Sequence, residues 1–246
     1  GTGDKILYKT AYSDIEEAMI VCREIQRIKN MDGCEYGDFA ILYRTNAQSR
    51  AFEEQMRKTA IPYRIYSGLS FYQRKEIKDA IAYMRLVVNP DDEEALKRVV
   101  NYPARGIGNT TMGKIQMAAT KAGVSLWEVI CNPSFYNTSI GTATTSKLGA
   151  FRSLVTCFKD KAEGEDAFTL TRSLLAESGM MKDIYEGKDA EDVARQENID
   201  EFLNSIMMFV DTRREEQDSP SVSVADFLQE VALLTDLESD DGEQSK

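Results

Sequence analysis

The sequence contains no histidine, and that absence excludes several kinds of functional site. A Ser–His–Asp triad, a Cys–His pair and a metal site with histidine ligands all need an imidazole ring. The four cysteines form no CxxC pair, so neither a zinc site nor a disulfide framework is indicated, and a reducing, cytoplasmic setting fits best. No apolar run approaches the roughly 20 residues that cross a bilayer, so we expect no membrane segment.

Charge of both signs is plentiful but unevenly distributed over the 246 residues, which carry a formal net charge of -11. Residues 1–115 hold 18 Lys and Arg against 16 Asp and Glu, whereas residues 116–246 hold 12 against 25. If the protein binds nucleic acid, the first half is therefore the better candidate surface.

The first 66 residues have the pattern of strands alternating with helices. Short apolar segments at Ile6–Tyr8, Phe39–Tyr43 and Pro62–Tyr66 predict three strands, and Ser13 begins a capping box for the first intervening helix. This alternation predicts a partial parallel sheet of the α/β class. Because three parallel strands leave open edges and the chain has no initiator Met, we expect a piece of a longer protein.

From residue 68 onward the apolar spacing predicts helices only. Stripes at three- and four-residue intervals recur as far as Leu234, and Ser125 with Glu128 forms a second capping box. The predicted domains are 1–67 (α/β), 68–238 (all-α) and an acidic flexible tail, 239–246.

The segment Leu42–Arg50 lies where a predicted strand ends and a helix begins. Free N–H groups and the positive helix end at such a place suit a phosphate, and Arg44, Asn46 and Arg50 can add hydrogen bonds. The pattern fits equally well a helix capped by Thr45 or Asn46 with arginines on the surface.

Two glycines flank an apolar residue in the segment Arg105–Thr111. Such a pair allows a tight turn between two helices, with the N–H groups of the turn pointing outward beside Thr111 and Lys114. A helix-hairpin-helix grips a phosphate run of duplex DNA in this way. On the pattern alone, an ordinary connection between two helices is the favoured interpretation.

A third segment, Phe71–Asp79, is basic and aromatic, and is either a hinge after Gly68 or the start of a helix with a solvated face.

Several of these segments resemble the UvrD/PcrA/Rep-type superfamily 1 DNA helicases. The resemblance rests on Ala40–Arg50, Arg74–Asp79, Asn89–Asp92 and Arg105–Gly108, with a looser match at Glu197–Phe202. It implies that residues 1–67 open a second, RecA-like motor domain and that residues 68–238 form its inserted helical domain. The hinge expected at Gly68 comes from the change of pattern there. The resemblance further implies contacts with DNA from two groups of residues. These are Arg44, Thr45, Asn46 and Arg50 for single-stranded DNA, and Gly106, Gly108, Thr111 and Lys114 for duplex DNA.

The resemblance implies an ATP-dependent DNA helicase that translocates on single-stranded DNA and unwinds duplex in DNA repair or replication. The intact protein would use ATP and Mg²⁺ as cofactors. This chain lacks the phosphate loop and the acidic and arginine motifs of the family, so we expect it to bind no cofactor and hydrolyse no ATP. Its partners would be DNA, the remaining motor domains and repair or replication proteins.

Two other functions stay open. The second half, with methionine pairs at 180–181 and 207–208, could be a regulatory module that binds a protein partner, and the whole could belong to a recombination helicase-nuclease.

Overall fold

The computed structural model describes residues 5–65, 70–217 and 222–243. Contacts divide the chain into two compact units, Gly1–Arg74 and Lys75–Lys246. Each unit is described separately below, as unit 1 and unit 2. The expected hinge, Gly68, lies outside the described residues. The domain limits at residues 67 and 238 and the acidic tail stay predictions.

Unit 1 is built on two helices, α1 (Asp14–Asp32) and α2 (Ser49–Lys58), that pack against each other. Ser13 begins α1 as expected, because its hydroxyl accepts a hydrogen bond from the N–H of Glu16 at 3.1 Å. Short 3₁₀ turns occur at η1 (Tyr36–Asp38), η2 (Asn46–Gln48) and η3 (Phe71–Gln73). The core between the two helices consists of Ala18, Cys22, Ile25, Ala51, Phe52, Met56 and Ile61.

The predicted partial RecA-like parallel sheet is wrong, because no strand occurs among the described residues. Ile6 is 98% exposed, and in the Phe39–Tyr43 segment Ile41 packs on the helical core while Leu42 is 94% exposed. A strand exists only where a neighbour pairs with its backbone, and within the described chain no backbone hydrogen bond joins the three segments. Apolar spacing indicates which side chains can be buried, but it does not supply that neighbour.

Unit 2 consists of helices connected by short turns. They are α3 (Lys75–Val88), α4 (Glu93–Val99), α5 (Asn109–Ala122), α6 (Leu126–Cys131), α7 (Thr142–Lys161), α8 (Ala167–Glu177), α9 (Met180–Tyr185), α10 (Ala190–Gln217) and α11 (Val224–Glu243). Ser125 caps α6 as expected, since its hydroxyl accepts from the N–H of Glu128 at 3.1 Å.

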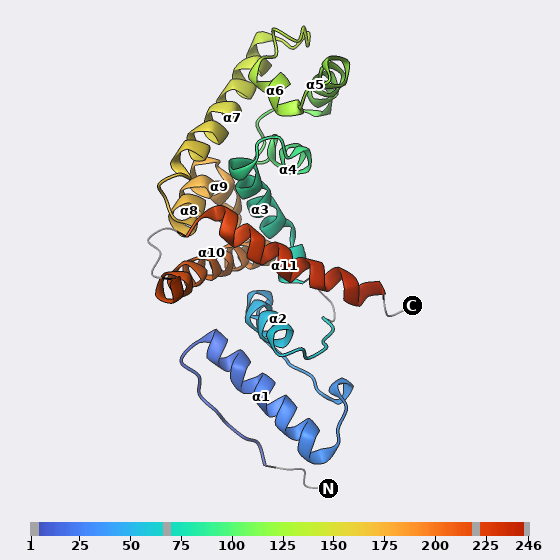
Figure 1. Cartoon of the computed structure of the whole chain (residues 1–246), viewed down its shortest axis with the longest axis vertical. Helices are drawn as coiled ribbons and strands as arrows, with labels where there is room; N and C mark the ends of the chain where they lie inside the picture. The colour runs from blue at the N-terminus through green and yellow to red at the C-terminus, as the bar shows by residue number, and fades with distance from the viewer. Residues whose placement is uncertain (1–4, 66–69, 218–221, 244–246) are drawn as a thin grey trace. The chain divides into compact units, whose positions relative to one another are not determined.

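Helix α3 is the central element of unit 2. It packs against α4, α7, α8, α10 and α11, and its side chains at Ile77, Tyr83 and Met84 are at most 1% exposed. Figure 1 shows α7 extending from α5 and α6, at one end of the unit, toward α8 and α9. Helix α5 packs mainly on α6 and buries only Ile115 and Ala119, so most of its surface is open to a ligand.

Helix α8 was not predicted from the sequence, although its signals are local. Its buried positions Ala167, Leu170, Leu174 and Leu175 follow helical spacing, and Asp166 caps its first turn through the N–H of Thr169 at 2.9 Å.

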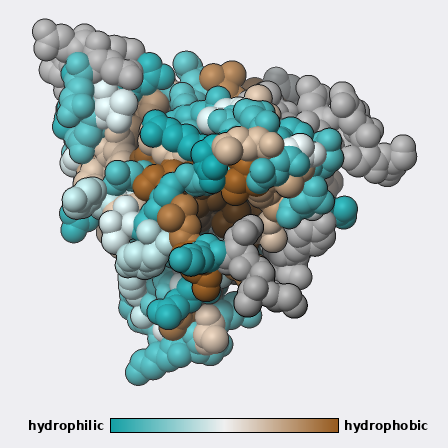
Figure 2. Space-filling view, turned by 90° about the horizontal axis from the view of Figure 1, so that it is seen from below, coloured by the Kyte–Doolittle hydropathy of each residue, from teal (hydrophilic) through white to brown (hydrophobic). Residues whose placement is uncertain are grey.

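The face of the molecule in Figure 2 is mostly hydrophilic, with hydrophobic side chains showing in patches. Among the helices of the described chain, none is both long enough and apolar enough to cross a membrane.

Candidate nucleic-acid interface

The turn between α4 and α5 is held from inside by two side chains. The amide oxygen Oδ1 of Asn101 accepts the N–H groups of Arg105 at 3.0 Å and Ile107 at 2.9 Å. Ile107 is 1% exposed and anchors the turn in the core, while Gly106 on its surface adopts φ = +71°, a conformation that favours glycine. The two glycines and the central isoleucine therefore form a defined, rigid turn.

Arg105 ties this turn to the rest of unit 2, a role that the sequence did not indicate. Its Nη1 donates to the carbonyls of Tyr102 at 2.8 Å and Val99 at 3.0 Å, and its Nη2 donates to the carbonyl of Ser178 at 2.8 Å. Nη2 also donates to the hydroxyl of Tyr83 at 2.7 Å. Burial raises the pKa of Tyr83, although the adjacent guanidinium opposes that shift. Arg105 is thus a structural residue under a surface turn.

The N-terminus of α5 follows directly and is open. Gly108 is its N-cap, no side chain caps it, and its first turn holds no acidic residue. Gly106, Gly108 and Lys114 are exposed and Thr111 is half-buried, and the ammonium of Lys114 donates to the carbonyl of Ser139 at 2.7 Å. The structure thus gathers the four residues expected to contact duplex DNA on one turn and the helix that follows it. An uncapped helix start of this kind attracts an anion.

Lys147 of α7 adds a positive charge that sequence reasoning missed. Its Nζ lies 2.5 Å from the position that a Cβ on Gly106 would take, although the two residues are 41 positions apart. Only the fold brings these residues together, so no local sequence signal could have found the pair.

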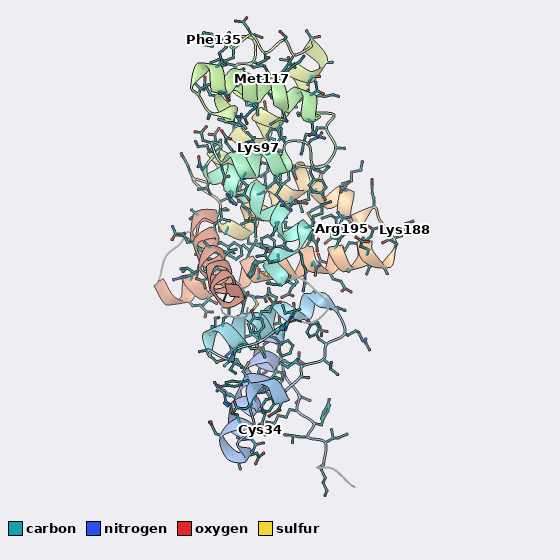
Figure 3. All side chains as sticks on the ribbon, turned by 90° about the vertical axis from the view of Figure 1, so that its right-hand side faces the viewer. Cys34, Lys97, Met117, Phe135, Lys188 and Arg195 are labelled. Atoms are coloured by element: carbon teal, nitrogen blue, oxygen red, sulfur yellow. The ribbon has the colours of Figure 1, made fainter. Side chains whose placement is uncertain are left out.

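The stretch that begins inside α4, after its acidic first residues, and ends just before Asp160 of α7 also concentrates positive charge. Residues 95–159 contain eight Lys and Arg but a single carboxylate, that of Glu128, within a chain whose net charge is -11. Figure 3 places the exposed side chains of Met117, on α5, and Phe135 together at this end of the unit. This region is therefore a cationic surface that unit 2 can present to a polyanion.

The expected single-strand segment in unit 1 is only partly open. The Oε1 atom of Gln48 accepts the N–H groups of Arg44 at 2.9 Å and Thr45 at 3.1 Å, so two N–H groups expected to be free are occupied. Asn46 lies in η2, but its side chain is outside the described part of the structure. Arg50 is 3% exposed and pairs with Glu54 at 2.9 Å and Asp14 at 3.5 Å. The structure therefore places Arg44 at the surface and turns Arg50 inward.

The Phe71–Asp79 segment provides buried side chains to both units. In unit 1, Arg74 donates to the hydroxyl of Ser49 at 2.8 Å, and that hydroxyl donates to Glu53 at 2.6 Å. Arg74 thus has a structural role in unit 1, and the helix start expected in this segment is found at Lys75, where α3 begins.

In unit 2 the same segment pairs with distant residues. Glu76 accepts a hydrogen bond from the amide of Asn198, and both side chains are buried. Asp79 pairs with Arg98 at 2.6 Å; burial raises the pKa of Asp79, while the guanidinium opposes that shift. The looser match at Glu197–Phe202 thus includes a residue that packs on α3.

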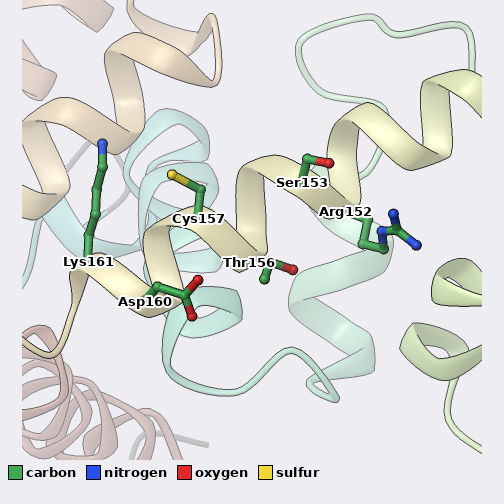
Figure 4. A pocket seen from close by; sticks show the side chains of 6 residues that line it. All are labelled: Arg152, Ser153, Thr156, Cys157, Asp160 and Lys161. Atoms are coloured by element: carbon green, nitrogen blue, oxygen red, sulfur yellow. The ribbon is translucent and has the colours of Figure 1, made fainter.

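In the part of the chain that the structure describes, a surface hollow and the potential metal ligands add no further candidate site. One surface hollow, of about 750 Å³, is lined by six residues that all come from α7, and Figure 4 shows them along that single helix. Within the described chain no group of three or more Cys, Asp and Glu side chains is placed to hold a metal ion.

Comparison with known proteins shows the family of the chain. The family described as "UvrD-like helicase C-terminal domain" matches residues 1–246. The chain is 38% identical over 238 residues to an ATP-dependent DNA helicase PcrA of Leuconostoc citreum, covering 97% of this chain and 32% of the relative. It is 36% identical over 236 residues to the protein of the same name from Bacillus subtilis, covering 96% of this chain and 31% of that relative. It therefore spans about a third of the length of these curated relatives. The chain belongs to the family of UvrD-like helicase C-terminal domains.

Proposed function

We propose that this chain is the DNA-contacting part of an ATP-dependent DNA helicase, and that unit 2 grips the backbone of duplex DNA with the α4–α5 turn. The observation that carries the proposal is the open N-terminus of α5, with Gly106, Gly108, Thr111 and Lys114 around one rigid turn. The relatives named above are ATP-dependent DNA helicases, which supports the same conclusion.

The chemistry at this turn fits a phosphate. N–H groups at the very start of a helix have no partner within the helix, and the helix dipole adds a partial positive charge there. In α5 these are the N–H groups of Asn109 and Thr110, because the N–H of Thr111 already donates to the carbonyl of Gly108 at 3.0 Å. No carboxylate in the first turn of α5 competes for them. Contacts of this kind position a duplex without reading its sequence, so binding should be sequence-independent and should weaken steeply with salt.

Unit 1 would contact single-stranded DNA through Arg44, Thr45 and Asn46. A phosphate oxygen that approaches the N–H groups of Arg44 and Thr45 must first displace Gln48, whose exposed side chain occupies them. We expect Gln48→Ala to tighten binding of an unstructured oligonucleotide several-fold, because the competing acceptor is gone. Unchanged or weaker binding, measured by fluorescence anisotropy, would remove these N–H groups from the proposed path.

ATP hydrolysis, translocation and unwinding are proposed for the intact polypeptide, with ATP and Mg²⁺ as its cofactors. A role in DNA repair or replication and a cytoplasmic location belong to the same proposal. The protein-binding alternative has less support. Of the four paired methionines on which it rests, Met180 is fully buried in the core and only Met207, at 39% exposure, reaches the surface substantially.

The test is duplex binding by the 246-residue chain with and without the double substitution Thr111→Asp and Lys114→Glu. Both changes add negative charge at the proposed phosphate site, so we expect affinity to fall at least tenfold at low salt. The matched control, Thr120→Asp with Lys121→Glu, makes the same change at two exposed positions at the far end of α5. Equal affinities for the two double variants would refute the role of the turn.

A further inference from the structure

Lys147 lies at the proposed duplex site but belongs to a different helix from the other contact residues. It is exposed on α7, and its ammonium lies against the backbone of Gly106. Within the described part of the chain, Lys147 makes no ion pair and no side-chain hydrogen bond. Its charge is therefore available to an external anion.

The surroundings leave this charge uncompensated. Helix α5 has no acidic residue, the connection from Val100 to Gly108 has none, and α7 has none before Asp160. Lys114 is the other lysine at the site, and it donates to the carbonyl of Ser139 just before α7 begins. Lys114 thus connects α5 with the segment that precedes α7. Lys147 places α7 next to the α4–α5 turn.

Gly106 has a second role in this arrangement. Its φ of +71° already favours glycine, and a Cβ at this position would meet the Nζ of Lys147 at 2.5 Å. A side chain at position 106 would therefore displace the ammonium from the turn. The glycine leaves room for the lysine as well as allowing the turn.

We infer that Lys147 is a further phosphate contact, which brings a cation from α7 to the same backbone run of duplex DNA that the α4–α5 turn binds. The inference rests on the proposed function and names a residue beyond those of the turn. Its ligand is the phosphodiester group. Bases are not read, because an ammonium on a flexible stem acts as a point charge.

The experiment compares Lys147→Gln with Lys159→Gln in the 246-residue chain. Both lysines are exposed on α7, and each substitution removes one positive charge, but Lys159 lies more than two helical turns beyond the site. Binding of a labelled 20-base-pair duplex is followed by anisotropy over a series of NaCl concentrations. We expect Lys147→Gln to weaken binding about three- to tenfold at low salt and to reduce the slope of log affinity against log salt by about one. Lys159→Gln should leave both quantities near wild type, and Lys147→Arg should retain most of the affinity.

The outcomes separate the inference from the proposed function. If the wild-type chain binds and the Thr111→Asp, Lys114→Glu variant does not, yet Lys147→Gln behaves like Lys159→Gln, the role of Lys147 is refuted and the turn stands. If the wild-type chain shows no duplex binding at low salt, both are refuted. Far-UV circular dichroism of each variant confirms that the comparison is made between folded proteins.

Discussion

Arg105 is the best place to test the link between core packing and the surface turn. Its guanidinium donates to the carbonyls of Val99, Tyr102 and Ser178 and to the hydroxyl of Tyr83, at 2.7–3.0 Å. Lysine at this position keeps the positive charge but has three donors on a single nitrogen, which cannot reproduce the spread of a planar guanidinium. Arg105→Lys therefore removes hydrogen bonds while it preserves charge.

The cost follows from the acceptors left without a donor. At least two of them lose their partner, and a buried acceptor without a partner costs roughly 1–3 kcal/mol. Because Arg105 is only half-buried and water can reach part of the group, each acceptor costs about 1–1.5 kcal/mol, near the low end of that range, and two of them give about 2–3 kcal/mol in the free energy of unfolding. For a protein of this size the melting temperature should fall by roughly 4–12 °C.

Urea unfolding monitored by tryptophan fluorescence measures this effect in the right part of the molecule. Trp127 is the single tryptophan and lies in α6, so its signal reports on unit 2. The matched control is Arg172→Lys at an exposed position of α8, which should change stability by less than about 0.5 kcal/mol. If Arg105→Lys also stays within that margin, Arg105 does not anchor the turn and the reasoning fails.

Two further predictions concern hydrogen-bonded polar groups in unit 2. Asn198→Asp places a second carboxylate against buried Glu76 and should lower the free energy of unfolding by about 2–4 kcal/mol at pH 7. The control, Asn204→Asp on the exposed side of α10, should change it little. Equal urea midpoints for the two variants would contradict the pairing of Asn198 with Glu76. Burial alone would raise the pKa of Asp166, but hydrogen bonds from Thr169 and the guanidinium of Arg214 together outweigh it, and the pKa lies below its usual range. The stabilisation is therefore present above about pH 4 and is lost as the pH falls through the lowered pKa. Asp166→Ala should cost about 1–2 kcal/mol at pH 7, with the difference fading in acid; a difference constant with pH would contradict the cap.

Much of the helical structure could be predicted because helix signals are local. Ser13 and Ser125 cap helices where their positions predicted, and the apolar stripes of α1, α3 and α5 face their cores. The strands could not be predicted correctly, because pairing depends on a neighbouring segment and not on the apolar run itself. Leu42, expected in a strand covered on both faces, is 94% exposed.

The candidate site was predictable only in part, for the same reason. The amino-acid sequence by itself determined where helices begin, which turn needs glycine at residue 106, and that cations outnumber carboxylates around that turn. Tertiary structure alone decided that Arg50 points inward, that Arg105 reaches the carbonyl of Ser178 across 73 positions, and that Lys147 lies over Gly106. A helix start is set by residues three or four apart, whereas a side chain's partner is set by which distant segments the folded chain brings within hydrogen-bonding reach.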